Sequence, residues 1–307
     1  MRVVVTGGAG FVGSHVVDAF LARGDEVVAV DDLSTGSRDH LSVTVDLVEL
    51  DVADGDALQA ALSEAAPDVI CHLAAQASVT VSVSNPDLDF ASNVRGTFNV
   101  CRTAGELGAQ VIFASTGGAI YGNAAPLPTP ETHVPEPLAP YGASKLAGEA
   151  FVGTQSRYDG LPNVILRLGN VFGPRQNPHG EAGVVAIFSD RLLRGEHPVV
   201  YGRGEPTRDY VHVRDVARAF TLAADRRTAG TFNVGCGEEV TVLELLDAVQ
   251  EAAGTDVGPL LEPLRPGELE RSAIDSTAAA HALGWRAEIP FREGITETFR
   301  WYANSQQ

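Results

Sequence analysis

A glycine triplet near the N-terminus is the feature that most limits what this chain can fold into. Gly7, Gly10 and Gly13 follow a β-branched run at 2–5 and lead into a helical pattern that is closed by Gly24. Glycines at this spacing allow a tight strand-to-helix turn, the approach of a pyrophosphate to the backbone, and close helix–strand packing. The positive end of the helix then faces the phosphates. The pattern predicts a dinucleotide site on a βαβ unit.

An acid after the second strand-like run, 27–30, indicates which dinucleotide is bound. Asp31 lies 18 residues beyond Gly13, where a carboxylate can accept hydrogen bonds from the adenosine ribose. Because its charge would repel a 2′-phosphate, we expect NAD rather than NADP. We expect the cofactor to be contacted by the glycine loop, by the segments after the following strands and by two later helices: Gly7, Gly10, Phe11, Val12, Gly13, Asp31, Asp32, Ser34, Asp51, Val52, Leu73, Ala74, Ala75, Gln76, Asn93, Tyr141 and Lys145.

Apolar runs alternate with helical periodicity along the first part of the chain. The later runs lie at 68–73, 110–114 and 163–168. This rhythm is typical of the α/β class, with a Rossmann-type doubly wound parallel sheet.

The pattern changes after about residue 170, where glycine, proline and charged residues become more frequent before a strand–helix pattern resumes near residue 209. We therefore expect an NAD-binding Rossmann domain from residues 1–170 plus 211–235. A smaller α+β substrate-binding lobe would come from 171–210 plus 236–307.

Charge and composition exclude several classes of partner. A net charge of −18 argues against nucleic acid. No apolar run reaches the roughly 18 residues that would span a membrane, and the N-terminus enters a strand at once, so we expect no secretory leader and a cytoplasmic location. Cys71, Cys101 and Cys236 are scattered without Cys-x-x-Cys spacing, which predicts neither disulfides nor a metal site.

The basic residues are 21 arginines and a single lysine, Lys145. Tyr141 precedes it by four positions on a predicted helix, so both side chains share one helical face. An adjacent ammonium favours the phenolate and lowers the pKa of a tyrosine, as a general base requires. The pair predicts a Tyr/Lys acid–base site.

Taken in order, these motifs support a family resemblance. The glycine triplet, His72-Leu-Ala-Ala-Gln76, the segment 115–122 (Ser-Thr-Gly-Gly-Ala-Ile-Tyr-Gly) and Tyr-x-x-x-Lys resemble the extended short-chain dehydrogenase/reductases. The segments 167–175 and 208–213 (Arg-Asp-Tyr-Val-His-Val) resemble the UDP-hexose 4-epimerase branch, of UDP-glucose/UDP-glucuronate type. The resemblance covers essentially the whole chain.

The resemblance implies roles for matching positions. Catalysis would fall to Thr116, Tyr141 and Lys145, with Ser115 as the alternative hydroxyl, because the 115–122 segment is one residue longer than the commonest epimerase form. A UDP-sugar would be held by Asn170, Val185, Tyr201, Arg208, Tyr210, Arg265 and Glu268. It also implies a homodimer, formed through helices around 93–107 and 141–157.

Related dehydratases and decarboxylases carry acids beside the catalytic hydroxyl, whereas Gly117, Gly118 and Ala119 follow it here. A 4-keto sugar would then only be reduced again, which favours a 4-epimerase. A nucleotide-sugar reductase or dehydratase, and a non-catalytic NAD-binding sensor, remain alternatives. The sugar itself stays open between a neutral hexose, a uronate and an N-acetylated hexose, with Arg191 as one candidate partner for a uronate carboxylate.

Overall fold

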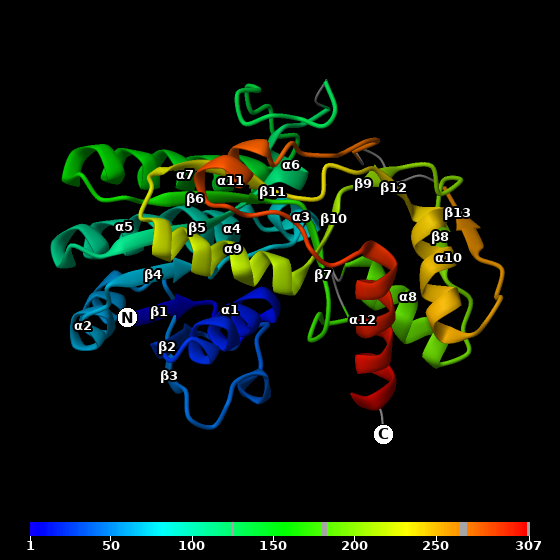
Figure 1. Ribbon diagram of the computed structural model, residues 1–307, viewed down its shortest axis with the longest axis horizontal. Coiled ribbons are helices and arrows are strands. Elements are labelled where there is room, and N and C mark those ends of the chain that lie inside the picture. Colours follow the sequence, from blue (N-terminus) through cyan, green and yellow to red (C-terminus); the bar gives the residue numbers. More distant parts are fainter. Residues whose placement is uncertain (124–125, 180–182, 264–268, 306–307) are drawn as a thin grey trace.

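The computed structural model describes residues 1–123, 126–179, 183–263 and 269–305. A sheet flanked by helices forms the larger part, and a smaller group of helices and short strands lies beside it (Figure 1). Within the described residues no helix is both long and apolar enough to cross a membrane.

The sheet confirms the predicted fold class. Its seven strands are ordered β11-β6-β5-β4-β1-β2-β3, and every neighbouring pair is parallel. The strands are β1 (Arg2–Thr6), β2 (Glu26–Asp31), β3 (Asp46–Glu49), β4 (Val69–His72), β5 (Gln110–Thr116), β6 (Val164–Leu168) and β11 (Gly230–Val234). The order reverses between β1 and β4, and such a reversal opens a ligand crevice at the carboxyl ends of the strands.

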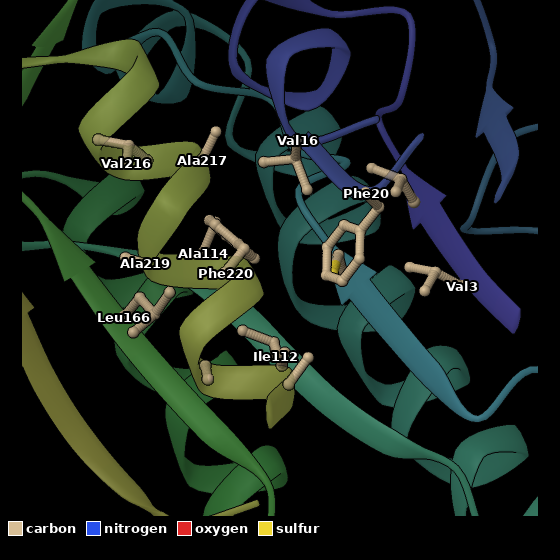
Figure 2. Packing of buried hydrophobic residues seen from close by; sticks show 14 of the residues in the cluster. Val3, Val16, Phe20, Ile112, Ala114, Leu166, Val216, Ala217, Ala219 and Phe220 are labelled. Carbon is tan, nitrogen blue, oxygen red and sulfur yellow. The ribbon is translucent and has the colours of Figure 1, made fainter. Parts of the chain in front are cut away.

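Helices cover both faces of this sheet, so its central strands are buried on both sides and their sequences are nearly continuous apolar runs. One face carries α1 (Phe11–Ala22), α9 (Val213–Arg226) and α11 (Thr277–Ala282). The other carries α2 (Gly55–Ala65), α5 (Gly96–Leu107) and α7 (Pro140–Asp159). In Figure 2, side chains of α1 and α9 gather over the sheet: Val16, Phe20, Val216, Ala217, Ala219 and Phe220 above Val3, Ile112, Ala114 and Leu166.

Short helical pieces connect the main elements at the carboxyl edge. Between β4 and α5 lie α3 (Val79–Ser84), α4 (Pro86–Asp89) and a π-helical turn, Phe90–Arg95. A 3₁₀ turn, Arg38–His40, follows β2, and α6 (Gly117–Ile120) follows β5 directly. These pieces, rather than the long helices, bring side chains to the end of the sheet.

The smaller part has its own apolar core. It contains β7 (Asn170–Phe172), α8 (Val184–Leu193), β8 (Val199–Tyr201), β9 (Thr207–Arg208), β10 (Tyr210–His212), β12 (Val240–Thr241), α10 (Val242–Ala253), β13 (Leu260–Glu262) and α12 (Phe291–Ser305). Phe172, Phe188, Leu245, Val249 and Ile295 pack together there. β7 pairs with β10 in parallel, so these two passages of the chain between the parts, out of several, run side by side.

One segment assigned to the smaller lobe packs elsewhere. Ala279, Leu283 and Trp285 are fully buried in the core under α1 and α9, and the Trp285 indole donates to the Asp215 carbonyl at 2.8 Å. We therefore propose that residues 277–287 belong to the sheet lobe and not to the smaller lobe. The other predicted boundaries of the two lobes are kept.

Candidate active site

The glycine loop joins β1 to α1 and has no room for side chains. Gly7 has φ +68°, and a Cβ at Gly13 would lie 1.9 Å from the Gly7 carbonyl oxygen. The N-terminus of α1 has no side-chain cap and no acid in its first turn, unlike α2 and α10, which are capped by Asp54 and Thr241. Uncapped N–H groups at a helix start are donors for an anion. The loop that contains Gly10, Phe11 and Val12 therefore fits a pyrophosphate.

Asp31 ends β2 beside this loop and is held rigidly. Its Oδ2 accepts from the Ala9 backbone N–H and its Oδ1 from that of Leu33, both at 2.9 Å. Burial raises the pKa of this carboxyl, and the two backbone donors oppose that shift. Asp32 in turn accepts from the backbone N–H of Ser34 at 3.0 Å and from its hydroxyl at 2.6 Å. Carboxylate oxygens fixed at the end of the second strand fit the ribose contact that the sequence predicts.

His40 is a residue of this crevice that the sequence reasoning missed. Its Nδ1 lies 2.9 Å from the Ala9 carbonyl, which also accepts from the Ser37 backbone N–H at 3.0 Å. The segment after β2 is thereby folded back onto the glycine loop. The contact joins two segments that are 31 residues apart in the sequence. No local sequence pattern could therefore have indicated that His40 holds this segment against the glycine loop.

Six further predicted cofactor residues lie after β3 and β4. Asp51 and Val52 follow β3, and Val52 is buried against α5, where a Cβ on Gly96 would lie 2.6 Å from its Cγ2. Leu73 to Gln76 follow β4, and the Leu73 N–H donates to the Thr6 carbonyl at 3.0 Å. The parallel register thus brings these segments to the same edge as the glycine loop.

Thr116 and Tyr141 come together at the end of β5. Thr116 is its last residue and Tyr141 lies in the first turn of α7, and their hydroxyl groups are close enough to interact. Burial raises the pKa of Tyr141 to about 12, the Asp89 charge raises it further, and the interaction with Thr116 lowers it. The expectation of a lowered pKa at Tyr141 is therefore wrong, because burial outweighs the interaction with Thr116.

Lys145 lies one turn further along α7 and is buried at 3% exposure. Its Nζ sits 4.7 Å from the centroid of the Phe113 ring, a cation–π contact. Burial lowers the pKa of the ammonium to about 8, although the carboxylates of Asp89 and Glu149 oppose the shift. The group is therefore charged at neutral pH but close to its titration point.

Ser115 lies on the opposite side of β5 from Thr116, because successive side chains of a strand alternate. Its hydroxyl donates to Glu149 Oε1 at 2.5 Å. Glu149 pairs in turn with the Arg167 guanidinium at 2.7 and 2.9 Å, and both side chains are 7% exposed. Arg167 also donates to the Tyr121 hydroxyl at 2.9 Å. Ser115 thus belongs to a buried polar network, whereas Thr116 faces Tyr141.

Asn93 projects from the π-helical turn toward the start of α7. Its Nδ2 donates to the Gln76 carbonyl at 2.9 Å and to the Ser144 hydroxyl at 3.1 Å. Its Oδ1 is buried and finds no hydrogen-bond partner among the described residues. An orphaned carbonyl oxygen beside the Tyr/Lys pair is consistent with the predicted cofactor contact.

The predicted substrate residues fall into two groups. Asn170 begins β7 close to the catalytic hydroxyls: a Cβ on Gly118 would lie 3.1 Å from its Oδ1 and 4.0 Å from Thr116 Oγ1. Arg208 and Tyr210 lie on β9 and β10 at the junction with the smaller lobe. Val185 is buried in α8 and Tyr201 ends β8, both within that lobe. Arg265 and Glu268 lie outside the described residues.

Asp209, between the two predicted substrate residues Arg208 and Tyr210, was also missed. Its carboxylate is buried and accepts from three backbone N–H groups, those of Cys236, Gly237 and Ile274, at 2.7 to 3.0 Å. It fixes the strands that present its two neighbours. Among the described residues no group of three or more His, Cys, Asp or Glu side chains is placed to hold a metal ion.

Comparison with known proteins agrees with this geometry. Residues 3–235 match the model of the NAD dependent epimerase/dehydratase family. A UDP-glucose 4-epimerase of Mycolicibacterium smegmatis is 43% identical over the full length of both chains.

Two solved structures are similar throughout. The UDP-glucose 4-epimerase of Thermotoga maritima, solved with UDP-glucose, has a TM-score of 0.98 at 41% identity and covers 100% of both chains. That of Thermus thermophilus, solved with NAD, has a TM-score of 0.93 at 45% identity and covers 99% of this chain and 100% of its own.

Proposed function

Since the chain belongs to the NAD-dependent epimerase/dehydratase family, we propose that it inverts C4 of a UDP-hexose and interconverts UDP-glucose and UDP-galactose. The relatives above act on, or bind, this class of nucleotide sugar by name.

The observation that carries the proposal is the interaction of the Thr116 and Tyr141 hydroxyls, with Lys145 buried one turn away. Two hydroxyls at that position can share the proton of a sugar 4-hydroxyl, with Tyr141 as the base. The Lys145 ammonium stabilises the negative charge that develops on the phenol oxygen. Burial raises the pKa of Tyr141 to about 12, so positive charge beside its hydroxyl favours the phenolate that the reaction requires.

Bound NAD supplies the reversible hydride acceptor and, in its oxidised form, a positive ring. The chain's own residues fit this group: the uncapped start of α1 fits the pyrophosphate, and Asp31 fits the ribose. Asn93 offers an unpaired Oδ1 beside the Tyr/Lys pair. A tightly held cofactor is regenerated in each turnover, so the protein contributes binding, orientation and electrostatics.

The segment after Thr116 favours epimerisation over elimination or decarboxylation. Gly117, Gly118 and Ala119 form the start of α6 and place no acid or base beside the sugar. A 4-keto sugar held there can only accept hydride again. If it turns over while anchored by its diphosphate, hydride returns to the opposite face and C4 is inverted.

We assign the diphosphate to Asn170, Arg208 and Arg265, and the nucleoside end to Val185, Tyr201, Tyr210 and Glu268. Asn170 supports the assignment because it lies near Thr116 at the start of β7, and Arg208 because it lies two residues before Tyr210, which pairs with Asn170. Local cations of this kind are what an anionic ligand requires in a chain of net charge −18.

We also propose a cytoplasmic homodimer. Phe98 on α5 and Phe151 on α7 are 43% and 38% exposed, and their rings contact each other at 5.4 Å between centroids. Phe90, in the π-helical turn before α5, is 56% exposed. Aromatic side chains gathered on the outer faces of two adjacent helices suit a partner of the same kind. Light scattering giving a monomer mass would contradict this.

The experiment is to incubate the purified protein with UDP-glucose and, separately, with UDP-glucuronate, without added NAD, and to follow the anomeric signals by NMR. We expect UDP-galactose to appear in the first tube. Faster conversion of UDP-glucuronate would make the substrate a uronate. No conversion in either tube, even with NAD added, would refute the epimerase.

A further inference from the structure

A buried carboxylate near the Tyr/Lys pair has no part in the function proposed so far. Asp89 is the last residue of α4 and is 2% exposed, whereas Asp87 on the same short helix is exposed. An ionised carboxyl group loses much of its hydration when it is buried, and its neighbours must compensate for that loss.

Two side-chain amides donate hydrogen bonds to the Asp89 carboxylate. Its Oδ1 accepts from Asn93 Nδ2 at 2.9 Å and from Gln76 Nε2 at 3.1 Å. Both amides are themselves held, because Gln76 also exchanges hydrogen bonds with the backbone of Ser78 at 2.5 and 2.8 Å. The carboxylate is therefore the centre of a fixed polar cluster within the segment between β4 and α5.

The cluster extends to the catalytic helix. Asn93 Nδ2 donates to the Ser144 hydroxyl at 3.1 Å, and Ser144 donates to the Tyr141 carbonyl at 2.9 Å. Asn93 lies in a π-helical turn, a distortion that is frequent at functional sites. A continuous series of hydrogen bonds thus connects Asp89 with the helical turn that carries Tyr141.

The charged and titratable neighbours define the electrostatic role of Asp89. On α7 the negative charge of Asp89 acts on Lys145 and Tyr141 and raises the pKa of both. The other carboxylate near Lys145, Glu149, is already paired with Arg167. His72 on β4 is neutral, since burial lowers its pKa to about 3. Lys145 is thus a buried cation on which the charge of Asp89 acts.

We propose that Asp89 is a positioning residue of the active site: its buried carboxylate is the counter-ion of Lys145 and, through Asn93 and Ser144, orients the turn that carries Tyr141. This role rests on the proposed function only in that Tyr141 and Lys145 are the catalytic pair.

Removing the Asp89 charge should shift both titrations in the same direction. Without it, the ammonium of Lys145 loses protons more readily and Tyr141 ionises more readily, so both pKa values fall. Catalysis needs Lys145 protonated and Tyr141 able to accept a proton. Both limbs of the pH–activity profile should therefore move to lower pH, by about one unit. If Asp89 only supported the fold, its replacement would lower the activity at every pH without shifting the pH–activity profile.

Because Lys145 is the only lysine of the chain, its titration can be observed directly. Protein labelled with [ε-¹³C]lysine gives one side-chain signal, which should titrate near pH 8 in the wild type, where burial sets its pKa. We expect the midpoint to fall by about one unit in Asp89→Asn. It should stay in place in Asp87→Asn, which removes the same charge from an exposed site on the same helix.

An unchanged or higher midpoint in Asp89→Asn would overturn the proposal, and so would a pH–activity profile that keeps its position. Asp89→Glu retains the charge and should restore the wild-type midpoint. Should Asp89→Asn fail to fold, Asp89→Ser removes the same charge with less bulk and is read in the same way. The titration needs no turnover, so a failure of the epimerase assignment would be seen separately, in the sugar assay.

Discussion

The buried pair of Glu149 and Arg167 allows a stability prediction whose size follows from its geometry. Both side chains are 7% exposed, and Glu149 accepts three hydrogen bonds, two from Arg167 and one from Ser115. Glu149→Gln keeps the shape but leaves the guanidinium buried without a counter-charge. Breaking one side of such a pair costs about 3–5 kcal/mol. We therefore expect a loss of this size in the free energy of unfolding.

The assay is urea unfolding at fixed protein concentration and pH 7. With an m-value of roughly 3 kcal/mol/M, the midpoint should fall by about 1–1.7 M. The matched control is Glu251→Gln, which breaks the exposed pair of Glu251 with Arg292, whose side chains are 71% and 61% exposed. Exposed pairs contribute at most about 1 kcal/mol. The urea midpoint of Glu251→Gln should therefore fall by no more than about a third of the fall expected for Glu149→Gln.

A double variant separates the lost charge from the lost packing. Glu149→Leu combined with Arg167→Met removes both charges, and apolar replacement of a buried pair is often tolerated. The double variant should recover only part of the free energy of unfolding that Glu149→Gln loses, because the hydroxyls of Ser115 and Tyr121 then lose their partners. The reasoning is refuted if Glu149→Gln costs less than about 1 kcal/mol, or if the double variant is less stable than the single one.

Four further outcomes are expected. Tyr141→Phe should lower turnover at least about 100-fold while UDP binding, measured by calorimetry, is retained; unchanged turnover would remove Tyr141 from the mechanism. Thr116→Ala should reduce kcat more than Ser115→Ala, since only Thr116 interacts with Tyr141; the reverse order would reassign the hydroxyl. Phe98→Asp should shift the light-scattering mass from dimer to monomer; a mass unchanged from a dimeric wild type would place the interface elsewhere. His72 is buried and neutral, because burial lowers its pKa to about 3. Its contribution to the free energy of unfolding is therefore complete above about pH 6.5 and falls by about 1.4 kcal/mol per pH unit below that value. In His72→Gln, the free energy of unfolding should depend less steeply on pH in this acid range.

The sequence predicted the parts of the site that depend on local spacing. The glycine loop, Asp31 and the Tyr141–Lys145 pair are each defined by short intervals along one strand or helix, and parallel strands bring their carboxyl ends to one edge. The fold class follows from the same alternation. These features could be predicted because the geometry of a regular element fixes them.

Other features depend on contacts between distant segments. Burial, which raises the pKa of Tyr141, results from packing of several elements and has no signature in a four-residue motif. Asp89 is one acid among many in an acidic chain until the fold places it against α7. Glu149 could have been suspected, because it lies four residues after Lys145 on the same helical face. Its partner Arg167 arrives from a separate strand.

The pairing of β7 with β10 has a consequence for motion. The chain leaves the sheet through β7 and re-enters it through β10, and these strands are joined residue by residue, with Asn170 opposite Tyr210 and Phe172 opposite His212. Two passages fixed to each other cannot swing independently. The chain also crosses between the lobes before β12 and on both sides of residues 277–287, so the ribbon is one of several connections. An opening of the smaller lobe that keeps this pairing would turn about the ribbon, and residues on the ribbon would move least. Asn170, at its start, would keep its place beside Thr116 while the far side of the lobe travels.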